Sequence, residues 1–277
     1  MKIKLTHSRQ TIQKKYNTIG SSPVRVKCED GNSYVCKYSV GTLTDFLFYE
    51  FLAASFLKTW ALGVPDFKFV KVKAHHIDED LELKKKYFEK TCFGLQYNEL
   101  YLDINESFRQ RPKRFYKRFS NSKNELLKIC LFDIWMGHSD RTEDNFNLMY
   151  DSGNDYRLIP IDHQSIFFNG NIFHLNNYNA KYEDSLLSSF LPLVLFNKKE
   201  LINYQILPEL QPFFKKAILN CKQSLPEIVE NIPDDWQLDK ELYENAILNN
   251  LFSDEWVEKS WNDFINFYQL TINKIVK

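Results

Sequence analysis

Three polar side chains in the second half of the chain have the types and spacing of a divalent-cation site. Four residues separate Asp140 from Asn145, and Asp162 follows seventeen positions after Asn145. The intervening segment is typical of a β-hairpin, which would bring its two ends side by side. Mg²⁺ prefers such oxygen ligands and keeps positions for phosphate oxygens. Taken singly, each residue is also a common turn residue, so the prediction depends on the three occurring together.

The same segment resembles the catalytic loops of protein kinases. In those enzymes an H-x-D segment, an Asn and a second Asp follow one another in this order. His138 and Asp140 match the first motif, whereas Asp162 is followed by His163 and Gln164 instead of Phe and Gly. The combination is similar to the HipA-like kinases and to the phosphoinositide-3/4-kinase-like group.

Other parts of the chain resemble the HipA-like kinases in the family's order, from about Thr18 to Leu251. The matching segments are Gly20-Ser21-Ser22-Pro23, Tyr34-Val35-Cys36-Lys37, Tyr49-Glu50-Phe51-Leu52-Ala53-Ala54, Leu62-Gly63-Val64-Pro65 and the stretch 228–236. They correspond to a phosphate loop, a strand lysine, the helix that follows, and a C-terminal segment. The resemblance is to the compact, stand-alone members of the family.

The resemblance implies a role for each residue in phosphoryl transfer. Asp140 would orient the acceptor hydroxyl and take its proton, while Asn145 and Asp162 would hold Mg²⁺ on ATP. Lys37 would reach the phosphates and Glu50 would pair with Lys37, because a buried ammonium needs a partner. For the strand lysine, Lys27 is the competing choice.

The presumed phosphate loop adds three ATP-binding candidates. Gly20, Ser21 and Ser22 would form a tight turn whose backbone N–H groups cover phosphate oxygens. Some HipA-like kinases autophosphorylate a serine in this loop, so Ser21 or Ser22 is a candidate for that modification. Arg141 would brace the catalytic loop or neutralise phosphate.

The first third of the chain must position the lysine, and its pattern favours strands. Residues 24–28 and 33–37 alternate around a Gly-containing turn, which predicts a hairpin. Residues 67–72 and 91–97 are further strand candidates, and the charged stretch 73–90 is expected to be an exposed excursion. One buried helix is predicted over 46–60, capped by Thr44-Asp45.

The rest of the chain is predicted to be mainly helical. A helix over 124–136 precedes the polar loop, a hairpin follows over 146–161, and helical periodicity dominates from about 182 to the end. The expected fold is therefore α+β and kinase-like with two lobes. The N-lobe would span 1–97 and the helical C-lobe 98–277, with a cleft between them.

Composition excludes several other classes of protein. Lys+Arg and Asp+Glu are both 36, so a strongly cationic nucleic-acid binder is unlikely by bulk charge. The eight glycines form neither G-x-G-x-x-G nor a Walker A loop. Five scattered cysteines without a Cys-x-x-Cys pair indicate reduced thiols in a cytoplasmic protein. No segment is long and apolar enough for a membrane span, and residues 1–16 lack the apolar region of a secretory signal.

Two further clusters have plainer alternatives. His138 and His163 suggest zinc, but no third soft ligand recurs nearby, which favours structural histidines. Basic and aromatic residues alternate over 108–118, which fits a nucleic acid, an acidic partner, a phosphorylated loop or a solvated amphipathic segment.

The predicted function is ATP- and Mg²⁺-dependent phosphorylation of a serine or threonine on a protein substrate. The resemblance also implies a toxin–antitoxin or other stress system with a separately encoded protein partner. The alternatives are a lipid or small-molecule kinase, a nucleotide-binding pseudokinase, and AMP transfer from the same fold.

Overall fold

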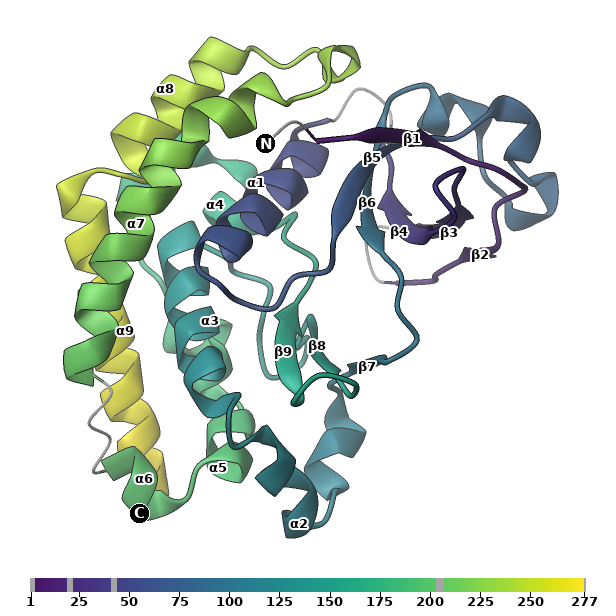
Figure 1. The fold of residues 1–277 in the computed structure, drawn as a ribbon. Helices are drawn as coiled ribbons and strands as arrows, with labels where there is room; N and C mark the ends of the chain where they lie inside the picture. The colour runs from purple at the N-terminus through teal and green to yellow at the C-terminus, as the bar shows by residue number, and fades with distance from the viewer. Residues whose placement is uncertain (1–2, 19–21, 41–43, 203–206, 277) are drawn as a thin grey trace. The chain divides into compact units, whose positions relative to one another are not determined.

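The computed structural model describes residues 3–18, 22–40, 44–202 and 207–276, and the chain divides into two compact units (Figure 1). Unit 1 comprises residues 1–55, 65–99 and 226–243, and unit 2 comprises 56–64, 100–225 and 244–277. Chain order alone predicts one boundary near residue 97. Contacts within the chain also group residues 226–243 with unit 1 and residues 56–64 with unit 2.

Unit 1 is built on a six-stranded sheet with the order β1-β5-β6-β4-β3-β2. The strands are β1 (Leu5–His7), β2 (Lys14–Lys15), β3 (Val24–Lys27), β4 (Ser33–Lys37), β5 (Phe67–Lys71) and β6 (Cys92–Gln96). β3 and β4 form the predicted antiparallel hairpin, with Val24 opposite Cys36. The predicted strands over 67–72 and 91–97 are confirmed as β5 and β6, which pair antiparallel.

The predicted buried helix is confirmed as α1 (Asp45–Thr59). Its Phe51 ring lies 5.1 Å from Phe69 of β5, so the helix covers one face of the sheet. Thr44 directly precedes this helix, as predicted for a cap, and its carbonyl accepts from the Phe48 N–H at 3.3 Å. Its hydroxyl donates a hydrogen bond to the carbonyl of Trp236, 2.7 Å away. Thr44 thus makes a tertiary contact.

The charged stretch 73–90 leaves many polar side chains exposed, as its composition predicts, but it is also anchored to the core. It forms three short 3₁₀ helices, η1 (Ala74–His76), η2 (Glu79–Leu81) and η3 (Lys85–Phe88). The apolar residues between its charges, Ile77, Leu83 and Phe88, are buried in the core with Val26 and Cys36. A few apolar side chains therefore hold this charged segment against the sheet.

Residues 226–243 complete unit 1 from the far end of the sequence. They include the 3₁₀ helix η9 (Asp234–Trp236). An Asp235 carboxylate oxygen accepts from the backbone N–H of Thr91 at 3.0 Å and also pairs with Lys71. The Trp236 indole N–H donates to the Thr91 carbonyl at 2.7 Å. The segment is thereby fixed to β5 and to the start of β6.

Unit 2 is mainly helical, as predicted for the second part of the chain. Its helices include α2 (Lys113–Tyr116), α3 (Lys123–Met136), α4 (Ile166–Gly170), α5 (Leu191–Leu195), α6 (Lys198–Ile202), most of α7 (Leu207–Glu230) and of α8 (Lys240–Asn250), and α9 (Asp254–Val276). Helix α3 lies beside α9 (Figure 1). The Trp256 indole N–H donates to the Trp135 carbonyl at 2.8 Å across this contact. Within the described residues, no helix has the length and apolar character needed to cross a membrane.

A three-stranded sheet in unit 2 carries the predicted second hairpin. The strands are β7 (Tyr101–Asp103), β8 (Leu148–Asp151) and β9 (Arg157–Pro160), in the order β7-β8-β9. Glu125 of α3 anchors the hairpin, since its carboxylate accepts from Arg157 Nε at 2.8 Å and from the Leu158 N–H at 3.0 Å. Helix α3 and the hairpin therefore form one support for the loops that flank them.

Candidate active site

His138 connects the two loops that carry the predicted metal ligands. Its Nε2–H donates to the carbonyl of Asp162 at 2.9 Å, and its Nδ1 accepts from the backbone N–H of Asp140 at 3.3 Å. Burial, together with the nearby Arg141 and His163, holds the pKa of His138 well below its ordinary value. The ring is therefore neutral at pH 7, and these two bonds fix its tautomer. Asp140 and Asp162 are thus held by opposite edges of one imidazole ring.

Arg141 holds the same two loops from within the protein. Its side chain is fully buried, and Nε donates to Asp133 of α3 at 2.9 Å. Nη1 donates to the carbonyl of Ile161 at 3.0 Å and to the carbonyl of Asn147. One guanidinium therefore joins a helix to the residues just before β8 and just after β9. This geometry supports the bracing role of Arg141 and leaves it no exposed surface for phosphate.

Two amides orient the Asp140 carboxylate. Asn145 Nδ2 donates to Asp140 Oδ1 at 3.0 Å, and Asn147 Nδ2 donates to the Asp140 carbonyl at 3.2 Å. Asp140 is half-buried, whereas Asn145 is exposed. Both carboxylate oxygens lie near amide donors, because Asn147 Nδ2 is also 3.5 Å from Oδ2. Asp140 and Asn145, selected by their spacing, are brought into direct contact.

Backbone conformations at the two ends of the hairpin are unusual. Asn147 has φ +41° and Asp162 has φ +59°, both in the left-handed region that non-glycine residues seldom occupy. The Ile161 N–H donates to the Asn147 carbonyl at 2.9 Å, which closes the hairpin between them. Strained backbone of this kind is frequent where a side chain must be aimed at a ligand.

The donor set around His138 fits a hard cation. Asn145 uses its amide nitrogen for Asp140, so its amide oxygen is the atom that can serve an ion. The Asp140 carboxylate adds oxygen donors beside this amide, and Asp162 is held near by its backbone carbonyl, which accepts from His138. Throughout the described part of the chain, no three His, Cys, Asp or Glu side chains gather as a metal-binding group. A cation here would therefore take its remaining ligands from phosphate or water, as Mg²⁺ commonly does.

The predicted lysine–glutamate pair is present in unit 1. Lys37 Nζ, at the end of β4, lies 2.5 Å from Glu50 Oε1 in the middle of α1. The Glu50 side chain is 1% exposed and that of Lys37 is 15% exposed. The competing Lys27 is instead used locally, since its Nζ donates to the Gly31 carbonyl in the hairpin turn. Lys37 is therefore the strand lysine with a buried carboxylate partner.

The predicted phosphate loop lies mostly outside the described residues. This applies to Gly20 and Ser21, whereas Ser22 is described, half-buried and just before β3. Their ATP-binding and autophosphorylation assignments stay predictions.

Sequence reasoning missed two residues that shape the site, Asn147 and Asp133. The repeated Asn-x-Asn of 145–147 is a usable signal for Asn147, because asparagine tolerates left-handed backbone. Asp133 gives a weaker signal as the carboxylate within the apolar run 129–136 of α3. Burial raises the pKa of Asp133 to about 6, against the opposing effect of Arg141.

A cavity of about 440 Å³ opens beside Asn145 within unit 2. Its lining comprises the stretches 103–107 and 144–148 together with Ile161. Space for a bound segment thus exists next to the loop that holds Asp140.

Comparison with protein families gives a match to the HipA-like kinase model over residues 10–263. The chain belongs to the HipA-like kinase family and is a kinase by family. Among curated proteins, none matches the chain significantly.

Solved structures include a kinase with the same fold. The chain is similar to the Helicobacter pylori proinflammatory kinase CtkA, with a TM-score of 0.55 and 12% identity, covering 94% of this chain and 97% of that one. A second match is the open conformation of CtTel1, with a TM-score of 0.37 and 10% identity, covering 92% of this chain and 11% of that one. The first match and the mixed architecture confirm the predicted α+β kinase-like fold.

Proposed function

We propose that this HipA-like kinase transfers the γ-phosphoryl group of ATP, with Mg²⁺, to a serine or threonine hydroxyl of a protein. The observation that carries the proposal is the set of hydrogen bonds by which His138 holds both Asp140 and Asp162. The Lys37–Glu50 pair gives independent support, because kinases use such a pair on the nucleotide phosphates. We also propose that the kinase N-lobe covers residues 1–97 and the C-lobe 98–277.

Each residue then has a defined part in the reaction. Asn145 and Asp162 would hold Mg²⁺, which when bound neutralises charge on the phosphates. Lys37 would contact the phosphates, and Glu50 would keep its ammonium in place. Asp140 would accept the hydroxyl proton as the new oxygen–phosphorus bond forms and ADP leaves. Amide donors near both Asp140 oxygens keep this carboxylate oriented, which favours proton transfer along one direction.

The decisive experiment is transfer of ³²P from γ-labelled ATP, followed by mass spectrometry of the labelled protein. Asp140→Ala should lower turnover by about two to four orders of magnitude while nucleotide binding is mostly kept. Glu143→Gln is the matched control, because Glu143 is an exposed carboxylate in the same loop. Equal turnover in Asp140→Ala and the wild type would reject the role of Asp140.

The same assay separates the remaining alternatives. Label from α-labelled ATP on protein would indicate AMP transfer, and label only on lipid or a small molecule would indicate that class of kinase. Mg²⁺-dependent nucleotide binding without any transfer would indicate a pseudokinase.

We further propose a cytoplasmic location and a separately encoded protein partner in a toxin–antitoxin or stress system. The five cysteines, all buried free thiols, support a reducing compartment. Co-purification of the chain with the product of a neighbouring gene would test the partner.

A further inference from the structure

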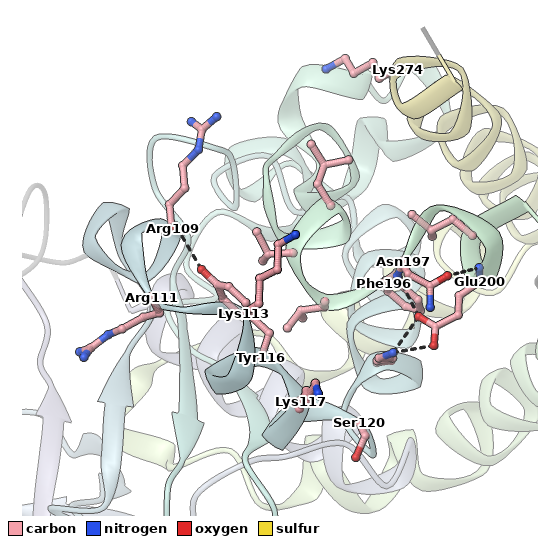
Figure 2. Close-up of a pocket in the computed structure, with 15 residues that line it drawn as sticks. Arg109, Arg111, Lys113, Tyr116, Lys117, Ser120, Phe196, Asn197, Glu200 and Lys274 are labelled. Atoms are coloured by element: carbon pink, nitrogen blue, oxygen red, sulfur yellow. Dashed lines mark hydrogen bonds and ion pairs between the residues drawn. The ribbon is translucent and has the colours of Figure 1, made fainter.

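A second, larger cavity in unit 2 is lined by an excess of positive charge. Its volume is about 970 Å³, and Figure 2 shows the side chains around it. One wall comes from residues 109–123, the other from 193–201, and α9 contributes Lys274. The cationic lining residues are Arg109, Arg111, Lys113, Lys117, Lys123 and Lys274.

Glu200 is the carboxylate of this lining, and it is already engaged. It accepts from Lys123 Nζ at 2.8 Å, and it also accepts from the Asn197 N–H at 2.8 Å. The bond from Lys123 and the Asn197 contact lower the pKa of Glu200, so it is ionised at pH 7. The pair Lys123–Glu200 therefore joins the two walls and cancels one positive charge of the lining.

The remaining cations are not neutralised by carboxylates in the described part of the chain. Arg109 and Arg111 lie over the rings of Phe190 and Phe115, at 5.7 and 5.5 Å. Lys113 and Lys117 are exposed, and Figure 2 shows Lys113 pointing into the space between the drawn residues while the Arg111 guanidinium points away. An anionic ligand would thus find uncompensated positive charge, with Lys113 at its centre.

The cavity wall is also partly apolar. Leu193 is 49% exposed at the cavity, next to the half-buried Val194. Phosphate-rich ligands would leave this wall in contact with water, whereas a peptide can place an apolar side chain on it. Charge and apolar surface together favour a peptide with acidic and apolar residues.

The cavity lies close to the catalytic loop through a chain of ring contacts. Phe146, directly after Asn145, lies 5.3 Å from Phe190, and Arg109 lies over the same Phe190 ring. The 3₁₀ helix η4 (Glu106–Gln110) also borders both cavities, with Ser107 lining one and Arg109 the other. A peptide docked in the basic cavity can therefore extend along η4 toward the loop that holds Asp140.

We propose that this basic cavity docks an acidic and partly apolar segment of the protein substrate, placed a few residues from the acceptor hydroxyl. The proposal rests on the proposed kinase function and specifies its substrate class. It assigns recognition to Lys113 and Lys117, away from the residues that perform the transfer.

The test uses the full chain and a fluorescein-labelled peptide that carries a Glu-Glu-Leu-Glu-Glu run. The same peptide with Gln for every Glu is the control ligand. Fluorescence anisotropy should give at least about tenfold tighter binding for the Glu peptide, and the difference should shrink as salt is raised. Equal affinities of the two peptides would overturn the proposal.

Charge-reversal variants locate the binding. Lys113→Glu and Lys117→Glu should each weaken Glu-peptide binding by about tenfold, because a like charge then faces the ligand. Arg114→Glu is the matched control, since Arg114 is exposed on the same helix and lies outside the cavity lining. Equal loss in Lys113→Glu and Arg114→Glu would overturn the assignment. The assignment would also be overturned if the protein bound single-stranded RNA or inositol hexakisphosphate through Lys113 and did not bind the peptide.

Peptide binding and phosphoryl transfer can fail independently. Asp140→Ala should bind the Glu peptide as tightly as the wild type does. Binding without ³²P transfer to any Ser-containing version of the peptide would count against the proposed function and leave the docking site standing. If wild type and Lys113→Glu transfer phosphate to a protein substrate at the same rate, the result would count against the docking site alone.

Discussion

Replacing Arg141 with methionine tests how the loops that carry Asp140 and Asp162 are held. The variant leaves the buried Asp133 carboxylate without its cationic partner and removes the donors to the Asn147 and Ile161 carbonyls. Breaking a buried ion pair on one side costs about 3–5 kcal/mol. For a protein of this size we therefore expect a fall in Tm of about 5–15 °C.

The loss should also depend on pH in a defined direction. Asp133 already has a folded-state pKa raised to about 6 by burial, and Arg141 limits that rise. Without Arg141 the pKa rises further, so the folded variant keeps a proton that the unfolded chain releases near pH 4. Stability from such a group falls as pH rises through the folded pKa. The destabilisation by Arg141→Met should therefore grow by about 1–2 kcal/mol between pH 6 and pH 8.

Urea unfolding followed by the fluorescence of the five tryptophans measures both effects. Arg141→Lys is the control that keeps the charge but reaches fewer acceptors, so it should lose less stability. If Arg141→Met does not fold, the double variant with Asp133→Asn removes the unpaired charge and should recover part of the loss. A loss under about 1 kcal/mol, or one that is independent of pH, would refute this account of Arg141.

Three further predictions concern other parts of the chain. Glu50→Gln removes the charge that holds Lys37, so it should lower the free energy of unfolding by about 1–3 kcal/mol and reduce phosphoryl transfer. Urea unfolding measures the change in stability, and the ³²P assay measures the change in transfer. Values equal to those of the wild type in both assays would contradict the pairing of Glu50 with Lys37. Gly63→Ala would place a methyl group against the Leu158 carbonyl and 3.2 Å from Ile159 Cγ1, so we expect a fall of about 1–3 kcal/mol in the same unfolding assay. A free energy of unfolding equal to that of the wild type would show that β9 can shift to make room for the methyl group. The five buried thiols should react with a disulfide reagent at pH 8 only after denaturation, since burial raises the pKa of Cys92 to about 12; rapid reaction of the native protein would contradict this.

Local patterns in the sequence predict the central strands β3 to β6, helices α1 and α3, and the β8–β9 hairpin. Alternation around the Gly31 turn is enough to predict the β3–β4 hairpin, and an apolar run with one carboxylate is enough to predict α1. In the same way, spacing alone brings Asp140 and Asn145 together, because five residues in a loop closed by a hairpin leave little freedom.

Side-chain contacts between different elements are what the sequence does not reveal. The bond of Arg141 to Asp133 links a loop to the previous helix, and the charge of Asp133 in an apolar run does not say which residue it pairs with. Charge counting also misses how 73–90 is anchored, because the few apolar residues that are buried there are outnumbered by charged ones. Burial depends on where those apolar side chains point, which composition does not record.

The assignment of residues 226–243 to unit 1 has a consequence for biosynthesis. Asp235 and Trp236 supply hydrogen bonds to Thr91, and Trp236 also accepts one from Thr44. A ribosome making this chain delivers those partners only after the intervening residues 100–225 of unit 2 have emerged. The strands of the first unit therefore remain incompletely covered until residues 226–243 are available. A fragment ending near residue 99 should consequently aggregate or remain partly unfolded.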